Sequence, residues 1–223
     1  MSLTQYRYRN AISGFFEYPT EHARRILPAH LEPVEVHHGT SIFSLSAFHF
    51  TESEVGAYGE VVMAVMAVPL VKPGERLPKA AYYPYLVSTT TKAARDHAIE
   101  RWHLPHWMAD VEIEFSQEGR GIGVRVKADG APVAEMSLTE HSWDPVSHRY
   151  QCFMKDGQGA YLAHITMQGE QSEHEEETGR LVLHEHPLHK DLVVAEVADV
   201  PFRELWMREG VQTFEPLVQL EPV

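Results

Sequence analysis

The pattern of apolar and polar residues along the chain predicts a protein built mainly of β-strands. Residues 42–48 and 111–115 mix or alternate the two kinds of side chain, as half-buried strands do. Residues 61–68 are apolar at every position, which is typical of a strand that is buried on both faces. The chain is therefore expected to contain both half-exposed and fully buried strands.

Turn residues separate further predicted strands. Asp129 and Gly130 lie between the alternating segments 123–127 and 133–138, and Asp-Gly favours the positive φ angles of tight hairpin turns. Two glycines within residues 157–159 indicate another turn between two later strands. Most of the strands are therefore expected to be joined by short connections.

Helical periodicity is found in two segments. We expect Thr20 to cap a short helix over residues 21–27, which Pro28 ends because the residue before a proline avoids the α region. A longer helix is predicted over residues 92–102, where three residues recur four apart on one apolar stripe: Ala94, Ala98 and Trp102. This stripe is expected to pack against the strands.

The order of these elements predicts the fold class. Strands do not alternate with helices, which argues against a doubly wound parallel sheet. We predict an α+β fold in which a mainly antiparallel β-barrel or strongly curved sheet carries a few short helices. The 223 residues show no repeat and no flexible linker, so one domain over 1–223 is expected. The acidic segment 170–177 is interpreted as a solvated surface loop.

Composition and charge exclude several classes of partner. Lys and Arg number 19 against 32 Asp and Glu, and a net charge of −13 repels nucleic acid and anionic lipid. The longest apolar run, residues 61–71, contains Pro69 and is far shorter than the ~20 residues that cross a bilayer. With one cysteine and no apolar run near the N-terminus, we expect a cytoplasmic protein that binds neither nucleic acid nor membrane. We also expect a homo-oligomer.

Familiar cofactor and nucleophile motifs are missing. The glycine-rich segment 119–123 leads into a predicted strand, whereas a dinucleotide fingerprint must open a helix. Cys152 lies in an apolar strand context, which suggests an inert buried thiol. The chain has 15 histidines, and those within 103–106 and 184–189 could suggest a zinc or iron site, but prolines interrupt both segments. We expect no cofactor and no metal.

Four segments together resemble the acetoacetate decarboxylase family. They are Tyr-Arg-Tyr-Arg-Asn at 6–10, a Leu-Pro-containing stretch at 25–33, Tyr-Gly-Glu within 56–60, and a helix end with Pro-His-Trp at 98–107. They follow the family's order and spacing over roughly half the chain, and the ordered set is more specific than any one member. The resemblance implies the family's barrel and an internal pocket.

The resemblance also implies site residues. Arg9 matches an arginine of the family's pocket, where it would hold a substrate carboxylate. Glu60 matches a glutamate placed near the nucleophile, and Ser44 stands where the family has another pocket carboxylate. Glu100 matches the glutamate of an Arg-Glu pair on the helix, whose arginine is replaced here by Ile99.

One departure from the family pattern concerns its chemistry. His106 stands at the position of the nucleophilic lysine and Trp107 at that of the lysine beside it. Acetoacetate decarboxylase is itself the standard example of a lysine activated by a neighbouring cation. A primary amine is needed to form the iminium that takes up electrons as CO2 leaves, and imidazole cannot form it. We therefore predict that this chain performs no Schiff-base decarboxylation.

Three functional hypotheses remain open from the sequence. In the first, Glu60 and His106 are catalytic acid/base groups that move protons next to a carbonyl of a small oxo-acid or related carboxylate. Arg9 would bind the substrate, Trp102 and Trp107 would be pocket walls, and the three polar residues would converge on one cavity. In the second, the chain is a noncatalytic small-molecule binding protein of the same fold. The third is a histidine-metal hydrolase or lyase.

Overall fold

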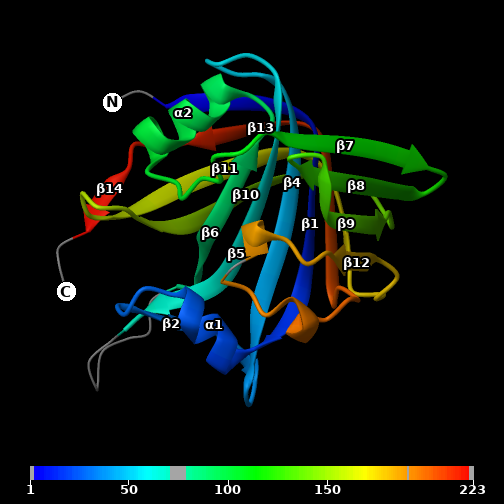
Figure 1. The fold of residues 1–223 in the computed structure, drawn as a ribbon. Helices are drawn as coiled ribbons and strands as arrows, with labels where there is room; N and C mark the ends of the chain where they lie inside the picture. Colours follow the sequence, from blue (N-terminus) through cyan, green and yellow to red (C-terminus); the bar gives the residue numbers. More distant parts are fainter. Residues whose placement is uncertain (1–2, 71–78, 190, 221–223) are drawn as a thin grey trace.

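The predicted barrel is present in the computed structural model, which describes residues 3–70, 79–189 and 191–220. Seven strands follow one another around it and close where β5 pairs with β4. Figure 1 shows the long β1 and β4 running side by side. The order begins and ends with the same strand: β5 (Tyr58–Pro69), β6 (Ala81–Thr89), β10 (Asp144–Lys155), β11 (Ala160–His174), β13 (Arg203–Phe214), β1 (Thr4–Pro19), β4 (Thr40–Glu52) and again β5.

Pairing within the barrel is antiparallel except at one seam. β6 and β10 run parallel, and the pair that joins them is Tyr82 with Cys152. All other neighbouring barrel strands are antiparallel. The architecture agrees with the predicted mainly antiparallel barrel.

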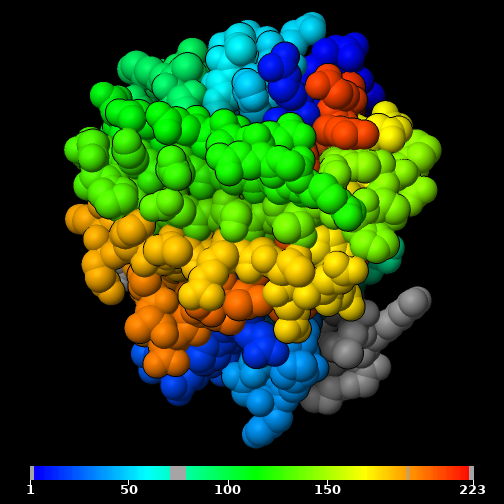
Figure 2. Space-filling model, turned by 90° about the vertical axis from the view of Figure 1, so that its right-hand side faces the viewer, coloured from blue at the N-terminus to red at the C-terminus, as the bar shows by residue number. Residues whose placement is uncertain are grey.

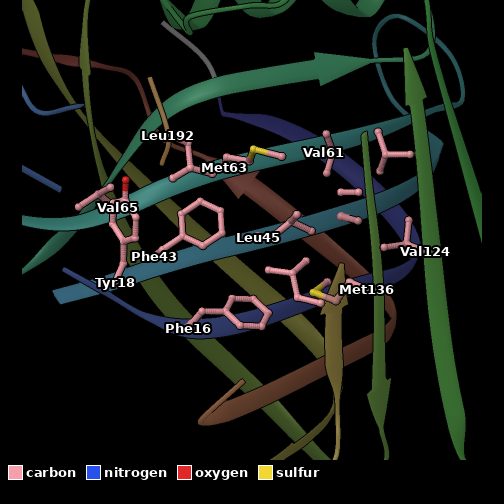
Figure 3. Packing of buried hydrophobic residues seen from close by; sticks show 14 of the residues in the cluster. Phe16, Tyr18, Phe43, Leu45, Val61, Met63, Val65, Val124, Met136 and Leu192 are labelled. Atoms are coloured by element: carbon pink, nitrogen blue, oxygen red, sulfur yellow. The ribbon is translucent and has the colours of Figure 1, made fainter. Parts of the chain in front are cut away.

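A second sheet covers one side of the barrel. Its four strands have the order β12 (Arg180–Leu183), β9 (Ala131–Thr139), β8 (Gly121–Ala128) and β7 (Val111–Glu118). Most of this sheet lies in the green band that crosses the face seen in Figure 2. Figure 3 shows Val124 and Met136 of this sheet facing Phe16, Leu45 and Val61 of the barrel strands. The main hydrophobic core therefore lies between the barrel wall and the second sheet.

Short elements complete the described part of the chain. Helix α2 (Lys92–Trp102) lies near the N-terminal half of β1, and α1 (Thr20–Ile26) lies at the other end of that strand (Figure 1). The remaining short strands and single-turn helices are β2 (Leu31–Pro33), β3 (Glu35–His37), β14 (Val218–Leu220), η1 (Pro187–His189) and η2 (Val194–Glu196).

The side chains of the apolar segment 61–68 pack on both sides of the strand, because successive side chains on a strand point to opposite faces. Val61, Met63 and Val65 are fully buried in the core beneath the second sheet. Their neighbours Val62 and Ala64 line a cavity inside the barrel. This explains why no polar residue interrupts this segment, as expected for a strand that is buried on both faces.

Several local predictions are confirmed. Asp129 and Gly130 have φ angles of 51° and 79° at the turn between β8 and β9. Ala94, Ala98 and Trp102 are the buried residues of α2. No helix in the described ranges is long and apolar enough to span a membrane.

Two local predictions are wrong. Thr20 does not cap α1, because its hydroxyl hydrogen-bonds the hydroxyl of Ser41 at 2.8 Å and the N-cap residue is Pro19.

The acidic segment 170–177 is not simply a loop, since β11 continues to His174. Pairing with β10 and β13 organises its first half, and Glu173 forms an ion pair with Arg203. Cross-strand partners distant in sequence outweigh local charge repulsion.

Candidate active site

The barrel contains a cavity of about 110 Å³. An engineered apolar cavity of ~150 Å³ accommodates benzene, so this space suits a small molecule of similar or smaller size. Every barrel strand contributes to the wall, which is mostly apolar. Its polar lining residues are Ser13, Ser44, Ser46, Glu60, Tyr82, Tyr150, Cys152 and Gln212.

Glu60 is the carboxyl group of this cavity. It lies on β5 between residues that face the main core, so strand alternation turns its side chain inward with Val62 and Ala64. Glu60 has no hydrogen bond or ion pair to any residue in the described part of the chain, and burial raises the pKa of its carboxyl to about 8. At neutral pH this carboxyl is therefore mainly protonated and can both give and take up a proton.

Thr89 pairs with Glu60 across two strands and contacts His106 through its hydroxyl. Thr89 is the direct cross-strand partner of Glu60 on β6, and such partners lie on the same face with Cβ atoms ~4.5–5.5 Å apart. The Thr89 hydroxyl lies 3.2 Å from Nε2 of His106 and 3.3 Å from the carbonyl oxygen of Thr91. The buried residue next to Glu60 in the strand pairing thus contacts the imidazole through its hydroxyl.

The hydrogen bonds of His106 define its tautomer. Its Nδ1 lies 2.8 Å from the carbonyl oxygen of Trp107, an acceptor, so Nδ1 carries the proton. Burial lowers the pKa of His106, so Nε2 is an acceptor and competes with the carbonyl oxygen of Thr91 for the one hydroxyl proton of Thr89. His106 does not line the cavity, whereas the nearby Leu104 does. His106 therefore contacts Thr89, the cross-strand partner of Glu60, and not the cavity itself.

Arg9 does not join Glu60, so the expected convergence of three polar residues on one cavity is not found. Tyr6 and Tyr8 are buried, and strand alternation turns Arg7 and Arg9 outward. The Arg9 side chain is 63% exposed, 4.0 Å from the carboxylate of Glu209. It lines a separate surface depression between the barrel and the second sheet.

The two tryptophans lie outside the cavity wall. Trp102 closes one end of the barrel from α2: its indole N–H donates to the Tyr6 hydroxyl at 2.7 Å, and its ring centroid lies 4.5 Å from that of Phe214. Phe214 is the residue that lines the cavity at this point. Trp107 packs against the main core, 6.0 Å from the ring of His186. Both indoles therefore support the barrel without facing its interior.

Sequence reasoning missed most of the polar wall. The oxygen of the Gln212 side chain is buried without a hydrogen bond, and Tyr82 and Tyr150 also line the cavity. Nothing in the alternating sequence around Gln212 indicates which of its faces points inward. Ser44, which the family resemblance placed in the pocket, does line the cavity. Burial raises the pKa of the Cys152 thiol to about 12, so it stays protonated as its apolar strand context predicted.

The lysines that the structure describes lie away from the cavity. They are Lys79, Lys92, Lys127 and Lys155, and none of them lines it. Lys72 and Lys190 fall outside the described residues. Among the described residues, no three or more His, Cys, Asp and Glu side chains are grouped so as to hold a metal ion. The described wall offers a carboxyl, hydroxyls and an amide, which are groups that can form hydrogen bonds.

Comparison with known proteins supports the fold assignment. Residues 2–216 match the family model described as acetoacetate decarboxylase. A search of curated protein sequences finds no match.

Three solved structures share the fold at low sequence identity. A structure of acetoacetate decarboxylase has a TM-score of 0.66 at 13% identity, covering 98% of this chain and 90% of that one. An acetoacetate decarboxylase-like enzyme from Sphingomonas wittichii has a TM-score of 0.63 at 13% identity, with coverages of 100% and 94%. The enduracididine biosynthesis enzyme MppR, complexed with pyruvate, has a TM-score of 0.59 at 12% identity, with coverages of 98% and 90%. With its barrel, the cavity inside it and a family match over nearly its whole length, the chain belongs to the acetoacetate decarboxylase family.

Proposed function

We propose that the chain is an enzyme that moves a proton at the carbon next to a carbonyl of a small molecule, without forming a Schiff base. The observation that carries this proposal is the Glu60 carboxyl, which lines the cavity inside the barrel and has no hydrogen-bond or ion-pair partner among the described residues. A buried acid that titrates near the working pH is well suited to general acid–base catalysis.

The proposed step is reversible enolisation. The carboxylate form of Glu60 takes a proton from the α-carbon, the C–H electrons move into the new C–C double bond, and the carbonyl oxygen gains negative charge. Tyr82 and Tyr150 stay protonated because burial raises the pKa of both phenols, that of Tyr150 to about 12, so both can donate to this oxygen. Glu60 then returns the proton to carbon.

His106 and Thr89 would help Glu60 to exchange its proton. The Thr89 hydroxyl can donate to Nε2 of His106 while its lone pairs accept the proton of the neighbouring carboxyl. In this proposal His106 acts as an acid/base group indirectly, through Thr89. Both acid/base residues expected from the sequence, Glu60 and His106, therefore keep a role. Arg9 has no part in the step, because its side chain is exposed outside the cavity.

The family relatives support a small oxo compound as ligand. One structural neighbour is an enzyme complexed with pyruvate. The cavity of this chain has room for a molecule of about that size. An oxo-acid, a related carboxylate or the corresponding neutral ketone are therefore the ligands to test first.

The decisive experiment is exchange of α-protons with solvent. 2-Butanone in D2O is followed by ¹H NMR with the wild-type protein, with Glu60→Gln and with Glu112→Gln, an exposed carboxylate of the second sheet. Loss of the α-proton signal is expected with the wild type and with Glu112→Gln, and a rate about 100-fold lower with Glu60→Gln. Equal rates with and without Glu60 would overturn the proposal.

A trapping experiment separates this chemistry from that of the decarboxylase. The protein is incubated with acetoacetate and borohydride, and its intact mass is then measured. An unchanged mass is expected, whereas a stoichiometric reduced adduct would reveal a reactive lysine. Ligand binding without any exchange would contradict the proposed chemistry and support the alternative of a noncatalytic binding protein. The cytoplasmic location and the homo-oligomer stay predictions from the sequence.

A further inference from the structure

Gln212 presents a buried amide oxygen without a partner to the cavity. The residue is 5% exposed, and its Oε1 has no hydrogen bond within the described part of the chain. It lies on β13, opposite Tyr6 of β1 and Met167 of β11 in the strand register, and it is one of the lining residues. A buried acceptor left unpaired is costly to the fold, and a ligand in the cavity that donates a hydrogen bond to it would remove that cost.

Glu60 and Gln212 belong to opposite walls of the barrel. From β5 to β13 the path around the barrel crosses β4 and β1 in one direction and β6, β10 and β11 in the other. A ligand in the cavity therefore lies between an acid on one side and an amide on the other. Across the cavity, Glu60 can supply a proton donor while the oxygen of Gln212 requires one.

The wall contains no group that would neutralise a negative ligand. No lysine, arginine or histidine of the described chain lines the cavity. The arginine expected to hold a carboxylate, Arg9, lies outside it. A carboxylate in this mostly apolar space would lose its hydration without gaining a cation.

Building on the proposed function, we infer that the ligand is a small neutral hydroxy-carbonyl compound. Its hydroxyl donates to Oε1 of Gln212, and its carbonyl end lies on the side of Glu60, where the proton transfer takes place. This narrows the ligand class, since it favours uncharged hydroxyketones over the oxo-acids expected from the family resemblance. Gln212 is thus assigned as a residue that determines specificity and takes no part in the chemistry.

Calorimetric titration with matched ligands tests this inference. Acetoin and 2-butanone differ by one hydroxyl, and the wild type is expected to bind acetoin at least about tenfold more tightly. Gln212→Met keeps the side-chain volume but removes the amide, so it should bind both ketones with equal affinity. Gln168→Met, which changes an exposed glutamine on β11, should keep the wild-type preference.

Thermal unfolding of the ligand-free protein shows whether the Gln212 side chain stabilises the fold or serves only to bind a ligand. Because its oxygen has no partner, Gln212→Met should leave the Tm unchanged or raise it. A large drop in Tm, equal binding of the two ketones by the wild type, or no binding of either would overturn the inference. So would a preference for acetoin that survives in Gln212→Met.

A second pair of ligands tests the charge. Methyl pyruvate is expected to bind more tightly than pyruvate, and the reverse order would contradict a neutral ligand. These results are independent of the exchange experiment. If Gln212 discriminates acetoin from 2-butanone but Glu60 does not affect exchange, the ligand class stands and the proposed chemistry fails. If exchange requires Glu60 but the wild type binds the two ketones equally, the proposed chemistry stands and the inferred ligand class fails.

Discussion

The hydroxyl of Thr89 lies 3.2 Å from Nε2 of His106, while Thr89 itself is the cross-strand partner of Glu60. Thr89 is therefore next to Glu60 in the strand pairing and contacts the imidazole through its hydroxyl. The family resemblance in the sequence matched His106 to the nucleophilic lysine, yet His106 is not among the residues that line the cavity. This contact is the route by which it can affect the chemistry.

Replacing the Thr89 hydroxyl should slow proton exchange. Thr89→Val keeps the shape of the side chain but removes the group between Glu60 and His106, so we expect exchange of 2-butanone α-protons to fall about tenfold. The pH at which the rate is half-maximal should fall, since the protonated carboxyl of Glu60 loses the oxygen proposed to accept its proton. Thr89→Ser should restore both values, and Thr51→Val, at an exposed site, should change neither. A normal pH profile in Thr89→Val would contradict this role.

Glu60 should make the fold less stable as the pH rises. Its pKa is raised from 4.5 in the unfolded chain to about 8, so between these values the native state binds the proton more tightly. The contribution of Glu60 to the free energy of unfolding is therefore full below pH 4.5 and is lost as pH rises through about 8. The loss is on the order of 5 kcal/mol.

Urea unfolding at a series of pH values measures this effect. Between about pH 5 and about pH 8, Glu60 should lower the free energy of unfolding of the wild type as the pH rises. Glu60→Gln should remove most of this decline. Glu112→Gln, which alters an exposed carboxylate, serves as the control. Identical pH dependence in the wild type and Glu60→Gln would show that the carboxyl is not desolvated.

Arg9→Ala should leave the cavity unaffected. The guanidinium is exposed and 4.0 Å from Glu209, a distance at which a surface ion pair contributes less than ~1 kcal/mol. We expect unchanged affinity for methyl pyruvate and acetoin and a change in the free energy of unfolding below ~0.5 kcal/mol. A large loss of affinity in calorimetric titration would show that Arg9 belongs to the binding site.

Gly210 should be essential to the barrel. A Cβ at this position would overlap the backbone oxygen of Gln168 and the hydroxyl of Tyr8, where β13 passes between β1 and β11. Gly210→Ala is expected to lower the free energy of unfolding by about 3 kcal/mol in urea titration. Gly157→Ala is the matched control, because nothing lies within 4 Å of its added Cβ. Equal stability of the two variants would contradict the close approach of these strands.

The sequence predicts the barrel well because local patterns carry that information. Uninterrupted apolar residues at 61–68, the Asp129-Gly130 turn and the stripe on α2 each depend on near neighbours, and the structure confirms all of them. The site is harder to predict. The alternation Tyr-Arg-Tyr-Arg already places Arg9 on the face opposite to the buried tyrosines, a constraint that positional resemblance alone overlooked.

The remaining site residues depend on contacts between distant parts of the chain. Gln212 comes into the cavity only when β13 closes the barrel between β1 and β11, and no local pattern around it shows which face points inward. The Thr89 hydroxyl contacts His106 because the segment after α2 returns beside β6, where Val87 pairs with His106. Glu60 could be found from sequence because the family resemblance covers its position.

The protonation state of Glu60 is the most direct test of the account. Protein labelled with ¹³C at the glutamate carboxyl carbon is titrated by NMR, and the signal of Glu60 is identified by its loss in Glu60→Gln. We expect the carboxyl of Glu60 to remain protonated at neutral pH and to titrate at about 8. A Glu60 signal that titrates with the exposed glutamates, near the ordinary value of 4.5, would contradict it.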